Sequence, residues 1–79
     1  MFINKTDDGK NNISGRKIAQ LRTEQKMSQR MLAEKLQING LDVDKNAIQR
    51  IEAGKRFVTD IELKAIADLF GVTMEYITD

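Results

Sequence analysis

Two stretches decide the fold of this 79-residue chain: MSQRMLAEKL at residues 27–36 and AIQRIEAGKR at residues 47–56. In the first stretch Leu32 and Leu36 are four residues apart, and in the second two isoleucines are three residues apart. This spacing gives each stretch one apolar stripe, as in an amphipathic helix. Gly40 lies between them, where it can end the first helix in a left-handed conformation. The two stretches therefore predict two consecutive short helices joined by a turn.

Helical spacing continues on both sides of these stretches, and cap residues mark the boundaries. Ser28 and Asp44 can each cap the N-terminus of a helix. Thr59 with Glu62 can form a capping box for a later helix, which Gly71 can end. No stretch alternates over enough residues to predict a strand. We predict an all-α bundle of five short helices, near residues 15–26, 28–38, 45–53, 60–70 and 74–78.

The beginning of the chain has a different character. Residues 1–13 are polar and aperiodic, so we expect residues 1–14 to be a flexible tail and residues 15–79 to be one helical domain. No run of about 18 apolar residues is present, so we expect no membrane span. Residues 1–8 lack the apolar segment of a signal peptide, and we therefore expect a cytoplasmic protein.

The amino-acid composition argues against an enzyme. A chain without cysteine has no disulfide, no thiolate zinc site and no cysteine nucleophile. A chain without histidine lacks the usual general base and the commonest metal ligand. A hydrophobic fraction of 41% and a charged fraction of 32% are typical of a small globular protein. We expect a binding protein with no cofactor and no metal.

One segment imitates a metal site but fails on geometry. Residues 42–46 read Asp-Val-Asp-Lys-Asn, like the start of a calcium-binding EF-hand loop. That loop needs glycine at its sixth position and a bidentate glutamate at its twelfth, where this chain has Ala47 and Ala53. Capping of a helix by Asp44 explains the acidic residue more simply.

Positive charge is concentrated in the middle of the chain, although the whole chain carries only +1. Residues 14–56 hold ten Lys or Arg against five acidic residues, a balance of +5, and residues 57–79 carry −4. Such an asymmetry is typical of a protein with one face for a polyanion and another for solvent or a partner. An accidental spread of solvated charge explains the same counts, so charge alone does not assign a function.

Four fragments in a fixed order match a known family: residues 16–22, 27–36, 47–56 and 63–72. Through them, the chain from Gly15 to Ile77 resembles the Cro and phage-repressor type of helix-turn-helix domain, often called the XRE family, with a lambda-repressor-like fold. The resemblance implies a transcriptional regulator that binds double-stranded DNA in a sequence-specific way.

The mode of action follows from the size of the chain. With no second domain to sense a ligand or recruit a polymerase, we expect a repressor that acts by occluding its operator. A lone domain of this size buries too little DNA for strong specificity, so we expect a homodimer on a near-palindromic operator.

The outer face of the third predicted helix carries the side chains that a DNA-reading helix needs. Asn can pair bidentately with adenine and Arg with guanine, and Ala can contact a thymine methyl group. We expect this face to consist of Lys45, Asn46, Ala47, Gln49 and Arg50. By resemblance, all of these except Ala47 stand at positions that read base edges, while Ile48 and Ile51 point inward.

The resemblance implies further contacts with the DNA backbone. Ser28 and the amides beside it would place a helix N-terminus against a phosphate. Gln29 matches a glutamine that contacts the DNA backbone and a neighbouring recognition residue. Lys55 and Arg56 match a loop that lies along the phosphates.

Two other features concern packing. Arg22 and Glu52 match an internal ion pair of the family, and a bidentate Arg–carboxylate bond favours this structural role over a DNA contact. The connection over residues 37–44 is longer than the family's tight turn by roughly five residues, which costs on the order of a few tenths of a kcal/mol. We expect Leu41 and Val43 to pack back onto the core and restore the angle between the helices.

The alternative function is protein binding, as in an antitoxin or anti-regulator, because a helix-turn-helix fold alone does not prove DNA binding. Its partner surface would comprise Phe57, Val58, Met74, Tyr76 and Ile77. A homodimer would use much the same surface, namely Phe57, Val58 and the final helix. The polar side chains of the third helix have no use in a pure protein adaptor, and this favours DNA binding.

Overall fold

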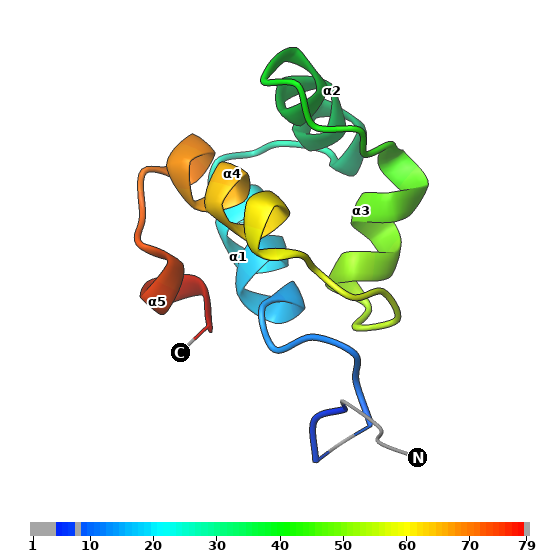
Figure 1. Ribbon diagram of the computed structural model, residues 1–79. Helices are drawn as coiled ribbons and strands as arrows, with labels where there is room; N and C mark the ends of the chain where they lie inside the picture. The colour runs from blue at the N-terminus through cyan, green and yellow to red at the C-terminus, as the bar shows by residue number, and fades with distance from the viewer. Residues whose placement is uncertain (1–4, 8, 79) are drawn as a thin grey trace.

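The computed structural model describes residues 5–7 and 9–78, and Figure 1 shows its five helices. In chain order they are α1 (Gly15–Glu24), α2 (Gln29–Ile38), α3 (Lys45–Glu52), α4 (Asp60–Phe70) and α5 (Met74–Thr78). No strand occurs among these residues, and none of the helices they form has the length and apolar character of a membrane span. The predicted all-α bundle of five helices is confirmed, with boundaries that differ by at most two residues.

The end of α1 is the boundary that the sequence placed least well. Lys26 adopts a left-handed conformation with φ of 57°, which is uncommon for a residue other than glycine. The Met27 amide then donates a hydrogen bond of 3.0 Å to the carbonyl of Arg22 and closes the helix. Because no glycine marks this turn, the pattern of the sequence extended the helix two residues too far.

Side-chain caps fix the starts of α2, α3 and α4, as predicted. Ser28 Oγ and Asp44 Oδ1 each accept a hydrogen bond from the amide three residues later, at 3.0 and 2.8 Å. Thr59 and Glu62 form the reciprocal capping box of α4, which ends at Gly71 with φ of 70°. Each cap contributes about 1 kcal/mol, so the caps define where the helices begin.

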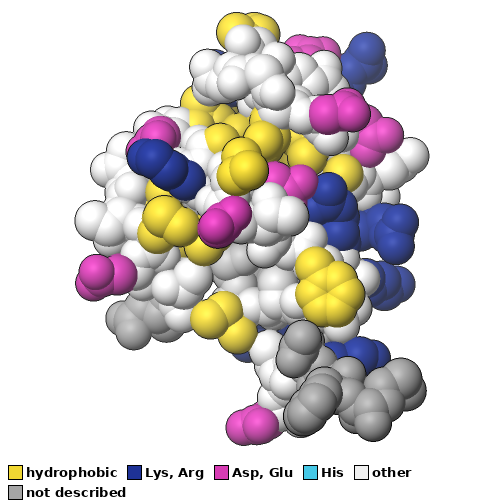
Figure 2. Space-filling model, in the orientation of Figure 1, with side chains coloured by type: hydrophobic (Ala, Val, Ile, Leu, Met, Phe, Trp, Pro, Cys, Tyr) yellow, Lys and Arg dark blue, Asp and Glu magenta, His cyan; other side chains and the backbone are white. Residues whose placement is uncertain are grey.

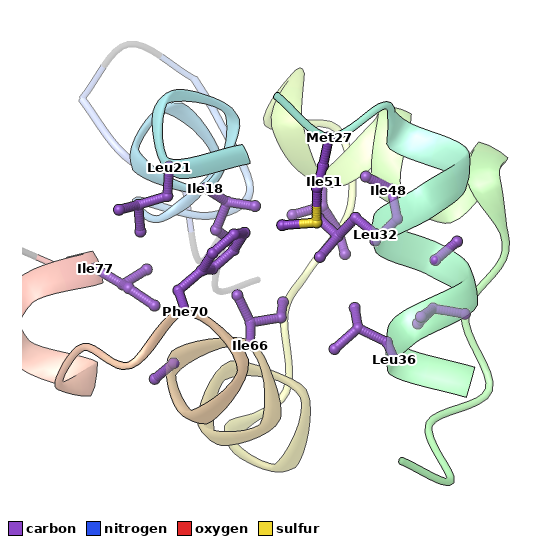
Figure 3. Packing of buried hydrophobic residues seen from close by; sticks show 13 residues of the cluster. Ile18, Leu21, Met27, Leu32, Leu36, Ile48, Ile51, Ile66, Phe70 and Ile77 are labelled. Carbon is purple, nitrogen blue, oxygen red and sulfur yellow. The ribbon is translucent and has the colours of Figure 1, made fainter. Parts of the chain in front are cut away.

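A single core holds the helices together (Figure 3). Phe70 of α4 lies close to Ile18 of α1 and Ile77 of α5. These residues pack the first helix against the last two. Ile48 and Ile51 of α3 are both 0% exposed. Full burial of an isoleucine contributes about 1.5–3 kcal/mol. These two side chains therefore fix which face of α3 is turned inward and which is left to solvent.

Hydrogen bonds hold the long connection between α2 and α3 in a defined conformation. Leu41 donates its amide to the carbonyl of Leu36 at 3.0 Å, and Gln37 Nε2 donates to the carbonyl of Val43 at 2.7 Å. Val43 is 2% exposed, and Leu41 packs against the core. The expectation that these two apolar residues pack inward is confirmed. The Gln37 bond, which the sequence did not indicate, ties the end of α2 to the start of α3.

The segment before α1 makes contacts that the sequence did not predict. Asn11 and Asn12 donate hydrogen bonds to backbone carbonyls at the end of α3 and in the loop that follows it. Residues 1–4 and 8, on which the flexible-tail prediction also falls, lie outside the described residues. That residues 1–14 form a flexible tail and residues 15–79 the domain stays a prediction.

Candidate nucleic-acid interface

The outer face of α3 presents polar side chains with free hydrogen-bonding groups. Lys45, Asn46, Gln49 and Arg50 are exposed, and within residues 5–7 and 9–78 their side chains make no hydrogen bond or ion pair. A surface hollow is lined by Asn46, Gln49, Arg50, Ala53 and Lys55. With Ile48 and Ile51 buried on the opposite side, this face is ready to bind a polar ligand.

Glu52, the last residue of α3, joins three helices. Its carboxylate accepts hydrogen bonds from Arg22 Nε at 2.6 Å and Nη2 at 3.0 Å, in a bidentate pair, and from Gln29 Nε2 at 3.0 Å. Arg22 Nη1 also donates to the carbonyl of Met27 at 2.7 Å. The hydrogen bonds and charge of Glu52 raise the pKa of Arg22. The predicted Arg22–Glu52 pair is confirmed, and it fixes α3 against α1 and the start of α2.

A second carboxylate organises the loop between α3 and α4. Glu62 accepts hydrogen bonds from Arg56 Nη1 at 2.9 Å and Nη2 at 2.8 Å, and from the amide of Thr59 at 3.0 Å. The Arg56 bonds, supported by Thr59, hold the pKa of Glu62 below its ordinary value of 4.5. The same pair raises the pKa of Arg56. Arg56 is thus bound to α4, whereas the neighbouring Lys55 is exposed and has no ion pair in the described part of the chain.

Charge is distributed unevenly over the surface. Figure 2 shows Lys and Arg side chains gathered along the edge formed by α3 and the loop after it, on the right of the view. Asp and Glu side chains lie mainly over the other elements of this face. Lys45, Arg50 and Lys55 are exposed on α3 and in the loop after it, and none of them has an ion pair in the described part of the chain. With the neighbouring amides of Asn46 and Gln49 they form a surface suited to a polyanion.

The helix pair formed by α2 and α3, with the polar face of α3 outward, has the arrangement of a DNA-binding helix-turn-helix. The sequence model of the helix-turn-helix family matches residues 18–77. The chain belongs to this helix-turn-helix family, of the Cro and phage-repressor type. Its members are DNA-binding transcription regulators, so the chain is a regulator that binds double-stranded DNA. A search of curated proteins and a search of solved structures each gave no match.

The predicted DNA-contacting residues of this helix-turn-helix protein fall into two groups. Most are exposed, at the start of α2, on α3 or in the loop after it: Ser28, Lys45, Asn46, Gln49, Arg50 and Lys55. Three others are engaged inside the protein. Gln29 donates to Glu52, Arg56 donates to Glu62, and Ala47 is half-buried against the core. Their contacts with DNA stay predictions.

Sequence reasoning missed the partners of Gln29 and Arg56. The sequence correctly predicted Glu62 as part of a capping box. It did not predict that the second carboxylate oxygen of Glu62 accepts a hydrogen bond from Arg56, six residues earlier. The signal in the sequence that could have predicted the Arg56–Glu62 pair was the acidic residue of the capping box, which follows shortly after the basic loop. For Gln29, the signal was the predicted pair at Glu52, whose carboxylate has room for a third donor.

Glu62 makes the stability of this helix-turn-helix protein depend on acidity. Because its pKa is lower in the folded chain than in the unfolded one, its contribution is fully present above the ordinary value of 4.5 and is lost as the pH falls through the folded-state pKa. We expect Glu62→Gln to lower the free energy of unfolding at neutral pH, and the difference from the wild type to shrink on acidification. Urea denaturation between about pH 3 and pH 7 measures this difference.

The matched control is Glu75→Gln, which changes an exposed carboxylate of α5. It should leave the pH profile of the wild type in place. Parallel profiles for Glu62→Gln and the wild type over the whole range would contradict the assignment.

Proposed function

We propose that the protein is a sequence-specific repressor that lays α3 in the major groove of its operator and blocks access to that DNA. The outer face of α3 carries this proposal. It offers exposed amide and guanidinium groups that bond to no other side chain or backbone group among the described residues, beside Lys55, an exposed lysine with no ion pair in the same part of the chain. Repression by occlusion needs only that the reading helix and its neighbouring phosphate contacts cover the site.

The side chains of α3 have separate roles in this proposal. Asn46 and Gln49 suit the donor and acceptor of adenine, and Arg50 suits the two acceptors of guanine. Lys45 lies at the start of the helix, one residue after its cap, and reaches a base edge or the adjacent backbone. The N-terminus of α2, capped by Ser28, directs its amides to a phosphate. Two helices then contact the same groove and its rim.

The first test concerns the electrostatic contribution to affinity. If the basic edge neutralises phosphates, the affinity for duplex DNA falls log-linearly with salt. Lys55→Ala should weaken binding to operator and scrambled duplexes alike, reduce the salt slope by roughly one unit, and leave the melting temperature unchanged. Fluorescence anisotropy titrations over a range of salt concentrations give the slope.

Lys64→Ala is the control, because this lysine of α4 is exposed and lies next to Asp68, outside the proposed interface. Its slope should equal that of the wild type. An affinity that does not depend on salt, or no duplex binding at low salt, would contradict the proposal.

The second test separates base reading from folding. Asn46→Ala and Arg50→Ala remove exposed side chains, so each should stay folded, cost about 1–3 kcal/mol at one base pair, and relax the preference there. Ile48→Ala should instead destabilise the fold by about 2–5 kcal/mol and lose binding only through unfolding. The measurements are gel shifts on a duplex obtained by binding-site selection, with thermal melts alongside.

Repression gives a second readout for the same variants. Asn46→Ala and Arg50→Ala should also lose repression of a promoter that overlaps the selected site. If both kept full discrimination while folded, α3 would not be the reading helix.

The third test concerns assembly. We propose a two-fold dimer on a near-palindromic site, formed through Phe57 and α5, because Phe57 is 60% exposed and Tyr76 43% exposed. Of the other residues expected on this surface, Val58 is half-buried. The expectation for Ile77 is wrong, because its side chain is 0% exposed and belongs to the core. Sedimentation with the selected duplex should give two protomers for each site. A monomer both free and bound would rule the dimer out, and the alternative role of holding a partner protein would then use this surface.

A further inference from the structure

The segment just before α1 is hydrogen-bonded to the loop that follows the reading helix. Asn12 Nδ2 donates to two carbonyls, those of Ile51 at 3.1 Å and Arg56 at 2.7 Å. Asn11 donates its amide to the carbonyl of Gly54 at 2.7 Å and its side-chain nitrogen to that of Lys55 at 3.0 Å. Four carbonyls at the C-terminal end of α3 and in its loop thus receive donors from two asparagines. These bonds tie the segment to the last turn of α3 and to the backbone of the loop after it.

Two glycines allow this close approach. A Cβ added at Gly15 would clash with the carbonyl oxygen of Ile51. At Gly54, which has φ of 76°, a Cβ would lie 2.8 Å from Cδ of Lys10 and 2.9 Å from its Cγ. The aliphatic part of Lys10 therefore lies directly over Gly54. A lysine stem packed in this way leaves its ammonium group for solvent or an anion.

The charge of this segment extends the basic edge. Lys10 and Lys55 have no ion pair among residues 5–7 and 9–78, and they flank the same glycine of the loop. A hollow lined by residues that include Lys10, Arg16 and Lys17 opens between the segment and α1. Figure 1 places the segment at the lower end of α3, and Figure 2 shows Lys and Arg side chains continuing to that end of the molecule.

From these contacts we propose that residues 10–12 are a second phosphate-binding element of the DNA interface. Lys10 binds a phosphate beside the one bound by Lys55. Asn11 and Asn12 are positioning residues that hold both lysines to the C-terminal end of α3. The proposal rests on the proposed DNA-binding role of α3, and its occupant is the backbone of the same duplex. Because the segment is already bonded to the loop, little chain entropy is lost when it meets the phosphate.

Lys10→Ala tests the phosphate contact. The salt slope of DNA binding should fall by roughly one unit relative to the wild type. Operator and scrambled duplexes should be weakened by the same factor, since a phosphate contact carries no sequence information. The contact of the Lys10 stem with Gly54 is also lost, so the melting temperature should fall slightly, and the slopes are compared where both proteins are folded. Lys64→Ala removes the same charge from α4 and should leave the slope as it is.

A double-mutant cycle tests the positioning role. If Asn12 holds Lys10 in place, Lys10→Ala should change the slope much less in an Asn12→Ala background than in the wild type. Asn12→Ala loses three hydrogen bonds, two donated by Nδ2 and one that Oδ1 accepts from the amide of Gly15, and should lower the melting temperature. Slopes are therefore compared where every variant is folded. If Asn12→Ala fails to fold, Lys10→Ala alone still decides the phosphate contact.

Each result has a distinct meaning. A wild type with a steep slope and a Lys10→Ala variant with the same slope would overturn the inference and leave the proposed function intact. A wild type without salt dependence would overturn both. Independent effects of Lys10 and Asn12 would remove the positioning role.

Discussion

The structure depends on the carboxylate of Glu52, which ends α3 and binds groups from α1 and α2 at once. A helix of eight residues is too short to be stable by itself, so its orientation has to come from its neighbours. Two buried isoleucines fix its rotation about its own axis, and Glu52 fixes its far end. The polar face is therefore presented in one direction. Leaving this carboxylate without Arg22 would bury an unpaired charge, which is strongly destabilising.

The loop after α3 is fixed at both ends by a carboxylate–arginine ion pair. Glu52 lies just before it and Glu62 just after it, and each carboxylate takes a bidentate arginine. The two asparagines of the N-terminal segment bind its backbone carbonyls between these points. Lys55 is left exposed in the middle of a fixed loop. An interface of this type keeps its phosphate-binding groups in position before the ligand arrives, which limits the entropy lost on binding.

Local signals in the sequence predicted most of the fold, and tertiary partners were what they could not predict. The apolar spacing and the caps at Ser28, Asp44 and Thr59 depend on neighbouring residues, so the helices could be placed from the sequence. The bonds of Asn12 join positions about forty residues apart and carry no periodic signal. Arg56 was predicted as a phosphate ligand from its place in the loop alone, and its engagement with Glu62 required the fold to be known. The Arg22–Glu52 pair could be predicted only because a family resemblance supplied the partner.

Gly15 has a consequence for any attempt to stabilise this protein. Replacement of a helical glycine by alanine is a common stabilising substitution, since alanine has the higher helix propensity by about 1 kcal/mol. A redesign guided by propensity would select this first residue of α1. Here the backbone of α1 meets the carbonyl of Ile51 with no space for a methyl group. The substitution would push the first helix away from the reading helix, and the position has to be excluded from such a library.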